Sequence, residues 1–323
     1  MLEPCWCRNE VVIICNGTHD IDLKNVFRNV SEAVKTSADK QYNTLIINNT
    51  AITEIVNKTF FDVTFKRIEI YAKSLRRIHD NAFADYNTDT IEEFHVFGDS
   101  NLGGDEYSDE VFTALSSLVN LRTVSFEETH LNRIQTRAFK LRTGAQNKLT
   151  GLDFGTTGGG DKTNDILIKS VGNYSFYYLK SLQSINLQNH RISRIGIHAF
   201  DIWKPSTMRM RISLINNTID DKSIEIGAFS NAKRPLFIEL GNNKLTYIEE
   251  RIFGPVLRLS NQTTIYFDGN PFVCDCKMNW LRMEREFYEN QIKYIVCLNY
   301  KSEAGTPTNF WDLSEKNFKE CRD

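Results

Sequence analysis

One spacing of apolar residues recurs along most of the chain and constrains its fold more than any other feature. In its clearest copy Leu45 and Ile47 are followed by the polar Thr50, then by two aliphatic residues and Phe60. Close copies begin at Ile68, Val124, Ile185 and Ile238, and weaker copies begin at Phe94, Leu152, Ile212 and Ile265. Successive copies start between 23 residues (45 to 68) and 33 residues (152 to 185) apart. Such a period predicts one structural unit stacked many times.

Each part of the pattern has a physical role. Two apolar residues spaced by two point to the same side of a short strand. The polar residue suits a bend, and the later aliphatic residues and Phe fill the interior from the returning segment. One coil cannot bury its own core, but stacked coils can. The alternative, unrelated strands of a β-sandwich, is disfavoured by the spacing and by an Ala-Phe pair that recurs at 82–83, 138–139, 199–200 and 228–229.

The cysteines lie only near the two ends of the chain. They are Cys5, Cys7, Cys15, Cys274, Cys276, Cys297 and Cys321. Terminal clusters with a cysteine-free middle are typical of secreted proteins, because disulfides persist outside the cell. Asn-x-Ser/Thr triplets, the acceptors of N-linked glycans, support this assignment. They begin at Asn16, Asn29, Asn48, Asn57, Asn173, Asn216 and Asn261.

Several classes of protein are disfavoured by composition. The formal net charge of -2 supplies no basic excess for a nucleic-acid partner. No stretch approaches the roughly 18 apolar residues of a membrane helix. Met1 is followed almost at once by Glu3, Pro4 and Cys5 rather than by an apolar signal segment, so we expect a removed signal or a fragment.

The repeats over residues 42–273 resemble extracellular leucine-rich repeats. The resemblance implies an α/β solenoid: a leucine-rich-repeat horseshoe with a parallel concave sheet of about nine strands. It also implies a mostly irregular or 3-10 convex side and cysteine-rich caps at both ends. We therefore expect an N-terminal cap over residues 1–41, the array over 42–273, and a C-terminal cap over 270–323.

The C-terminal run from Asn270 to Leu281, with Cys274-x-Cys276 and Trp280, resembles the C-terminal cap of this family. The family pairing implies Cys274–Cys297 and Cys276–Cys321 bridges; the alternative is a zinc site. At the other end, the pairing implies Cys5–Cys15 and leaves Cys7 without a partner. Residues 22–35 predict a helix capped by Asp22, which either closes the first coil, the preferred interpretation, or binds a partner.

Catalytic chemistry has no support in the sequence. The histidines form no nucleophilic or metal-binding constellation, and the common hydrolase and zinc motifs are absent. The Gly155–Thr163 stretch differs from a phosphate-binding loop because Asp161 intrudes before Lys162. We therefore predict a protein that is not an enzyme and has no cofactor or metal.

The concave face remains as the candidate binding surface. Strand alternation places there an aromatic cluster and an acidic run: Tyr71, His95, Phe97, Glu69, Glu127 and Asp153. Exposed aromatic residues beside charges are typical of interface centres. The alternatives are that these are ordinary surface residues, or that the inserted loops Asn101–Glu110 and Gly155–Asp165 bind instead.

The coils and caps resemble those of secreted arthropod-type leucine-rich proteins, which include the non-catalytic subunit of oplophorus-type luciferase. The resemblance implies a secreted, non-enzymatic scaffold that binds a protein partner, such as an accessory subunit of a secreted complex. The alternative is the ectodomain of a cell-surface receptor in adhesion or innate immunity. The sequence indicates neither the partner nor the oligomeric state.

Overall fold

The computed structural model describes residues 3–36, 38–98, 100–103, 107–140, 148–156, 167–303 and 305–321. Their contacts group into two units. The first comprises Met1–Ile168 and Tyr178–Leu182, and the second comprises Lys169–Tyr177 and Gln183–Asp323. Each unit contains coils that contribute strands to a parallel sheet, as the repeat spacing predicts.

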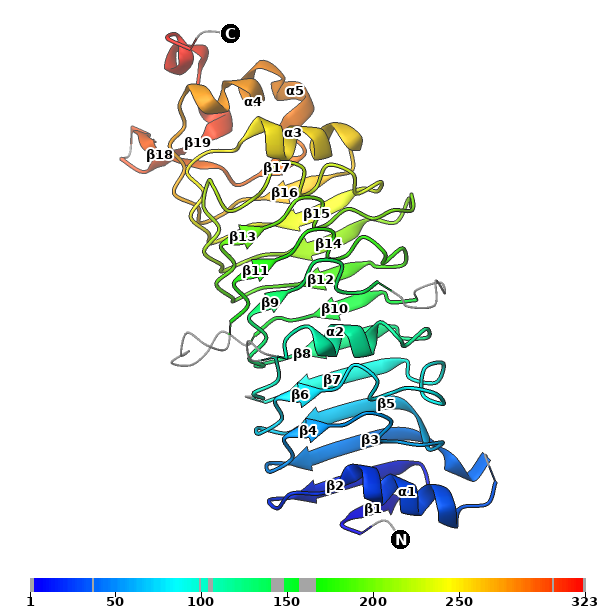
Figure 1. The fold of residues 1–323 in the computed structure, drawn as a ribbon. Helices are drawn as coiled ribbons and strands as arrows, with labels where there is room; N and C mark the ends of the chain where they lie inside the picture. The colour runs from blue at the N-terminus through cyan, green and yellow to red at the C-terminus, as the bar shows by residue number, and fades with distance from the viewer. Residues whose placement is uncertain are drawn as a thin grey trace. The chain divides into compact units, whose positions relative to one another are not determined.

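The sheet of the first unit begins with an antiparallel pair and continues in parallel (Figure 1). Its strands, in spatial order, are β1 (Cys5–Arg8), β2 (Val12–Gly17), β3 (Gln41–Asn49), β5 (Thr64–Tyr71), β7 (Glu93–Phe97), β8 (Thr123–Phe126) and β10 (Gly151–Asp153). Four of them contain the repeat starts Leu45, Ile68, Phe94 and Val124, whose side chains are buried. Leu152 holds the same place in β10.

The second unit continues the same pattern with strands that are all parallel. They are β12 (Ser184–Asn186), β14 (Met210–Ser213), β15 (Leu236–Glu239), β16 (Thr264–Tyr266) and β17 (Ile292–Lys293). The first four contain the remaining predicted starts, so the nine expected strands are confirmed. Strand β17 is an addition from the C-terminal cap, where the repeat pattern predicted no strand.

The described parts of the returning segments are mostly irregular, as expected, but contain short strands and two α-helices. The strands are β4 (Glu54–Ile55), β6 (Arg77–Ile78), β9 (Arg133–Ile134), β11 (Ser170–Val171) and β13 (Arg194–Ile195). The helices are α2 (Glu110–Leu115) and α3 (Glu250–Leu259). In α3 the buried Ile252, Phe253, Val256 and Leu257 recur at helical spacing, which explains why this return is helical. The described 3-10 segments lie near the caps: η1 (Ala38–Lys40), η2 (Cys276–Met278), η3 (Phe310–Asp312) and η4 (Glu315–Phe318).

The interior is filled by phenylalanines from consecutive returns. In the first unit the rings of Phe60 and Phe83 stack with centroids 5.9 Å apart. In the second unit Phe200 stacks on Phe176 at 5.5 Å and on Phe229 at 5.1 Å. All five rings are almost completely buried, so the recurring Phe of the sequence pattern continues the core from coil to coil.

The predicted N-terminal helix is α1 (Leu23–Ala33), and it closes the first coil. The Asp22 side chain accepts a hydrogen bond from the backbone N–H of Asn25 at 2.9 Å, which caps the helix start. Its buried Phe27 meets the rings of Phe60 at 5.1 Å and Phe65 at 5.6 Å. This packing agrees with the closing role rather than with a helix that is free to bind a partner.

The polar bend position is occupied by buried asparagines in the later coils, Asn217, Asn243 and Asn270. In the first copy the sequence spacing points to Thr50, but the structure uses Asn49. Asn49 is fully buried, and its Oδ1 accepts from the backbone N–H groups of Ala51 at 2.8 Å and Ile52 at 3.0 Å. Thr50 is exposed. The Asn49 amide both donates and accepts, so it supplies hydrogen bonds to the backbone groups of this buried bend. The Thr50 side chain is shorter and points to solvent instead.

Three disulfides close the two caps. They join Cys5 to Cys15, Cys274 to Cys297 and Cys276 to Cys321, the pairs that the family resemblance implies. Cys7 is exposed and not disulfide-bonded. The positions of the boundaries between caps and array, near residues 41 and 270, stay a prediction.

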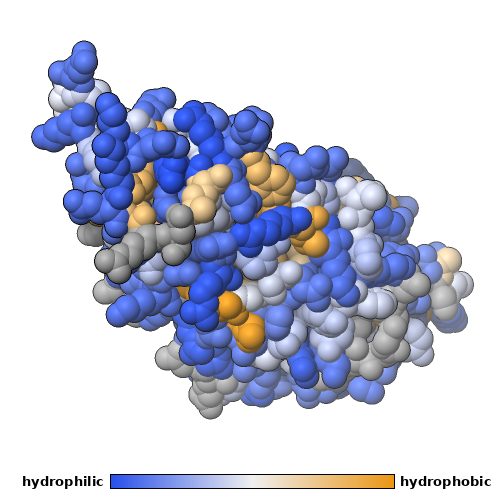
Figure 2. Space-filling model, turned by 90° about the horizontal axis from the view of Figure 1, so that it is seen from above, coloured by the Kyte–Doolittle hydropathy of each residue, from blue (hydrophilic) through white to orange (hydrophobic). Residues whose placement is uncertain are grey.

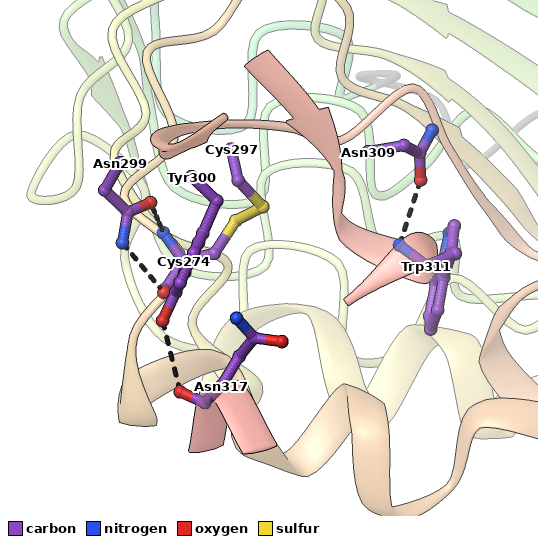
Figure 3. The surroundings of a disulfide bond; sticks show 7 residues. All are labelled: Cys274, Cys297, Asn299, Tyr300, Asn309, Trp311 and Asn317. Carbon is purple, nitrogen blue, oxygen red and sulfur yellow. Dashed lines mark hydrogen bonds between the residues drawn. A yellow bond between two sulfur atoms is a disulfide. The ribbon is translucent and has the colours of Figure 1, made fainter. Parts of the chain in front are cut away.

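The C-terminal cap contains α4 (Asn279–Met283), α5 (Arg285–Tyr288) and the antiparallel pair β18 (Val296–Lys301) and β19 (Pro307–Asn309). Figure 3 shows how Asn299 holds the backbone of Cys274: its Oδ1 accepts from the N–H at 2.9 Å, and its Nδ2 donates to the carbonyl at 3.1 Å. The indole N–H of Trp280 donates to the carbonyl of Ile248 at 3.1 Å, which ties the cap to the array within the second unit.

The surface seen from above is mostly hydrophilic with small hydrophobic patches (Figure 2). Exposed apolar side chains of the C-terminal cap include Met283, Phe287 and Leu298. Among the helices of the described segments, none combines the length and the apolar character that crossing a membrane requires.

Candidate binding surface

The sequence-predicted aromatic residues lie together on the solvent-facing side of the first unit's sheet. Strand register places Tyr71 of β5 directly beside Phe97 of β7, and Glu69 beside His95. The rings of Tyr71 and Phe97 stack with centroids 5.0 Å apart, and those of His95 and Phe97 stack at 5.8 Å. Tyr71, His95 and Phe97 therefore form one contiguous group, called the aromatic cluster below.

The aromatic cluster is open to solvent at one end and half-buried at the other. Tyr71 is 40% exposed, while His95 and Phe97 are half-buried. Burial of Phe97 between two rings fixes its orientation before any partner arrives, so little side-chain freedom is left to lose on binding. The cluster thus has the rigidity expected of an interface anchor.

An ion-pair network that the sequence analysis missed lies beside the cluster. The Arg67 guanidinium binds Glu69 Oε1 through Nε at 2.6 Å and Glu93 Oε2 through Nη1 at 2.6 Å. The Tyr71 hydroxyl donates to Glu69 Oε2 at 3.4 Å. Arg67 lies two residues before Glu69 in β5, and Glu93 lies two residues before His95 in β7. Neither was among the site residues predicted from the sequence. Because one arginine is shared by two glutamates, the network beside the cluster keeps a net negative charge.

The other two predicted acidic residues each accept a hydrogen bond from a residue two positions away in the sequence. Glu127 Oε1 accepts from the Ser125 hydroxyl at 3.3 Å, and Asp153 Oδ1 accepts from the backbone N–H of Gly155 at 2.9 Å. Asp153 is in β10, three strands from Glu69 in β5, which at about 4.8 Å per strand is roughly 14 Å. The structure therefore does not join the predicted acidic run into one patch.

Burial determines the charge state of the cluster. It lowers the pKa of His95, and the nearby Arg67 charge lowers the pKa further, although Glu93 Oε2 lies 3.5 Å from Nε2. Burial, followed by the charge of Glu69, raises the pKa of Tyr71. At neutral pH the imidazole is uncharged and the phenol is protonated. The surface offered to a partner is therefore aromatic with a polar rim, the composition of interface centres.

Two potential glycan acceptors share the column of the cluster. Register places Asn48 beside Tyr71, and Asn16 beside Asn48. Both asparagines are exposed, as are the acceptor residues Asn29, Asn57, Asn216 and Asn261, whereas Asn173 is half-buried. A glycan on Asn48 would stand next to the Tyr71 ring, so any test of the cluster must control for it.

The rival loop surfaces are only partly described. Residues 104–106 of Asn101–Glu110 and residues 157–165 of Gly155–Asp165 lie outside the described segments, which includes most of the glycine-rich stretch. At the end of the first loop, Glu110 begins α2 and binds Arg77 through both carboxylate oxygens at 2.8 Å. That end of the loop is therefore anchored to the neighbouring return.

The fold of the chain is also found in solved structures of other proteins. Two solved structures share 14% sequence identity with the chain. One is a chain of the octameric complex of Latrophilin 3 (Lec, Olf), Unc5D (Ig, Ig2, TSP1) and FLRT2 (LRR). Its TM-score is 0.55, and the match covers 98% of this chain and 93% of that chain. Human 5T4 (Wnt-activated inhibitory factor 1, trophoblast glycoprotein) has a TM-score of 0.51 and covers 97% of both chains.

Sequence similarity points to the same family. Toll-like receptor 7 of Drosophila melanogaster is 28% identical over 120 residues, which is 36% of this chain and 8% of the receptor. The chain thus spans a small part of that relative. Six copies of the BspA type leucine rich repeat region match residues 36–147 and 163–268, more than half of the chain. The repeats that the apolar spacing predicts are therefore leucine-rich repeats, and the chain belongs to the BspA type leucine rich repeat family.

Proposed function

We propose that the protein is a secreted, non-enzymatic scaffold that holds a protein partner on the aromatic cluster, as an accessory subunit of an extracellular complex. The observation that carries the proposal is the stack of Tyr71 on Phe97 at 5.0 Å with Tyr71 40% exposed. Aromatic anchors of this kind, held rigid before binding, contribute about 2 kcal/mol or more each at interface centres.

Two further observations support an extracellular role. The three disulfides require an oxidising compartment to persist. The fold is that of a chain in the octameric complex of Latrophilin 3, Unc5D and FLRT2, which is an assembly of proteins.

The experiment begins by capturing a partner from the native extracellular fluid with the immobilised protein, followed by affinity measurement with the purified partner. Tyr71→Ala and Phe97→Ala should each weaken binding at least tenfold, about 1.4 kcal/mol, with little change in melting temperature. The matched control is Tyr86→Ala, because Tyr86 is 61% exposed and lies outside the cluster. Equal affinity of all three variants and the wild type would refute the proposal.

The potential glycan acceptor provides a second control. If the cluster is the working surface, Asn48→Gln should bind the partner as well as or better than the glycosylated wild type, because no sugar then stands beside Tyr71. Binding that is lost with Asn48→Gln but retained with Tyr71→Ala would mean that the partner recognises the glycan instead.

The second candidate function is the ectodomain of a cell-surface receptor in adhesion or innate immunity. The similarity to Toll-like receptor 7 of Drosophila melanogaster favours it. Sequencing the full-length transcript distinguishes the two candidates, because a receptor requires a membrane-spanning segment encoded after residue 323.

A further inference from the structure

A second row of aromatic rings lies on the sheet of the second unit. Phe237 of β15 contacts Tyr266 at the end of β16, with ring centroids 5.0 Å apart. Tyr266 in turn contacts Tyr294, just beyond β17, at 5.4 Å. Ile238 and Ile265 are fully buried, so the adjacent Phe237 and Tyr266 lie on the solvent-facing side. Tyr294 follows the end of β17 and is 58% exposed.

Two arginines frame the β15 end of this row. The Arg209 guanidinium carbon lies 4.8 Å from the centroid of the Phe237 ring, and that of Arg211 lies 5.6 Å from the same centroid. Arg211 also binds both carboxylate oxygens of Glu239, at 2.8 and 2.9 Å. Arg209 is exposed and has no carboxylate within ion-pair distance in the described part of the chain. The Arg211 guanidinium is thus paired within the protein, whereas the Arg209 guanidinium is available to pair with a ligand.

The balance of charge on this surface favours an anionic ligand. Besides the two arginines, Lys293 stands directly beside Tyr266 in the strand register. Among the described residues, the nearby carboxylates include Glu239, whose side chain is only 15% exposed and already paired, and Asp268, which lies two residues beyond Tyr266. Glu289, whose backbone carbonyl accepts a hydrogen bond from Lys293 Nζ at 3.0 Å, is paired with Arg285. The aromatic cluster of the first unit differs, because its single arginine is held by two glutamates.

We propose that Arg209, Arg211, Phe237, Tyr266 and Tyr294, the arginine–aromatic surface, bind an extended acidic segment of a partner protein that also carries aromatic residues. The open Arg209 pairs with a carboxylate of the segment, while its guanidinium also rests over the Phe237 ring. The row of three rings, with neighbouring centroids 5.0 and 5.4 Å apart, accepts the uncharged side chains of the same segment.

A peptide fits these features better than a sulfated polysaccharide. A polysulfated chain needs several unpaired cations along its length, because its affinity comes mainly from charge. Here one arginine is unpaired and most of the surface is aromatic. The inference does not rest on the aromatic cluster of the first unit and concerns a different ligand chemistry.

The test uses the full chain and a fluorescein-labelled peptide of sequence Glu-Glu-Tyr-Glu-Glu-Tyr, with binding followed by fluorescence anisotropy. Arg209→Gln and Tyr294→Ala should each weaken binding about tenfold. The matched controls are Arg194→Gln, because Arg194 is a 70% exposed arginine on a returning segment, and Tyr71→Ala in the aromatic cluster. Both controls should bind the peptide as the wild type does.

A third variant tests whether an added free positive charge strengthens peptide binding, and it removes no contact to the peptide. Glu239→Gln frees the Arg211 guanidinium, so it should bind the acidic peptide more tightly, by several fold. A peptide with Gln in place of every Glu should lose most of the affinity.

Several outcomes would overturn the proposal: no binding of the acidic peptide, equal binding of its glutamine analogue, or equal losses in Arg194→Gln and Arg209→Gln. Binding of a sulfated heparin hexasaccharide without binding of the peptide would assign the surface to a glycan instead. Because Tyr71→Ala should leave peptide binding unchanged, failure here and failure of the proposed function are separate results.

Discussion

Asn217 and Asn243 lie on consecutive coils and donate side-chain hydrogen bonds to the same backbone carbonyl, that of Leu214, at 3.0 and 2.9 Å. Asn243 and Asn270 share the carbonyl of Leu240 in the same way, at 3.0 and 2.8 Å. A carbonyl oxygen has two lone pairs and can accept both. Each asparagine therefore closes its own bend and also joins its coil to the preceding one.

Asn243→Ala should lower the free energy of unfolding by about 2–4 kcal/mol. The substitution leaves the Leu214 and Leu240 carbonyls short of one donor each, and it removes the acceptor of the Ile219 N–H, which binds Asn243 Oδ1 at 3.0 Å. Urea unfolding followed by circular dichroism measures the loss. Asn231→Ala, at an exposed asparagine, should change stability by less than about 0.5 kcal/mol. Equal effects of the two variants would show that the shared carbonyls add nothing.

His95 should make the fold less stable in mild acid. Its pKa in the folded protein is lowered by burial, whereas in the unfolded chain it is about 6.5. The unfolded state therefore binds the proton first, so the stability contribution is complete above about pH 6.5 and is lost as pH falls toward the lowered pKa of the folded state. Arg67, Glu69 and Glu93 are the charged groups that act on the imidazole.

Melting temperatures at pH 7.5 and pH 5.5 measure this effect. The decrease should be smaller in His95→Gln than in the wild type, because Gln does not titrate. His19→Gln, at an exposed histidine, should show the wild-type decrease. An undiminished decrease in His95→Gln would assign the acid sensitivity to other groups.

Loss of the longer disulfide of the C-terminal cap should destabilise the cap. Cys276 and Cys321 are 45 residues apart, and a loop of that length corresponds to about 3–4 kcal/mol in the chain-entropy model. The double variant Cys276→Ser, Cys321→Ser should be cleaved by protease near the C-terminus much faster than the wild type. Cys7→Ser, at the exposed unbridged cysteine, is the control and should resist cleavage as the wild type does. Unchanged cleavage of the double variant would contradict the prediction.

Phe200→Ala should cost about 3–5 kcal/mol of stability, because the ring is fully buried and stacks on a ring of each neighbouring coil. Phe200→Leu should cost less, since it leaves a smaller cavity. Trp203→Ala provides the exposed aromatic control, as Trp203 is 46% exposed. Denaturant midpoints of the three variants check the order, and a Trp203 effect as large as that of Phe200→Ala would contradict it.

The repeat spacing was sufficient to predict the strands, because alternation decides which side chains face the core and a one-residue slip would expose Leu45 and Ile47. It also predicted the aromatic cluster, since Tyr71 and Phe97 follow from the same alternation. For the bend of the first copy it predicted Thr50, which was wrong, because both Asn49 and Thr50 are polar and spacing alone does not reveal which one is buried.

The pattern could place only part of the arginine–aromatic surface. Arg211, Phe237 and Tyr266 are adjacent to repeat starts, but Arg209 precedes its strand and Tyr294 belongs to the cap, so neither of these two occupies a repeat position. Arg67 was missed because its role depends on where a long flexible side chain ends, and strand alternation fixes only the side of the sheet from which it starts.

The stacked phenylalanines have a consequence for how the chain can change in length. Phe200 meets Phe176 and Phe229 through the same kind of ring contact, and Phe229 meets Phe253 similarly, at 6.3 Å. If one whole coil were removed, the phenylalanine rings of its two neighbours could therefore stack on each other. If one coil were duplicated, the added ring could stack on both of its neighbours. The number of coils in such an array can therefore change by whole units while the phenylalanine stacking continues.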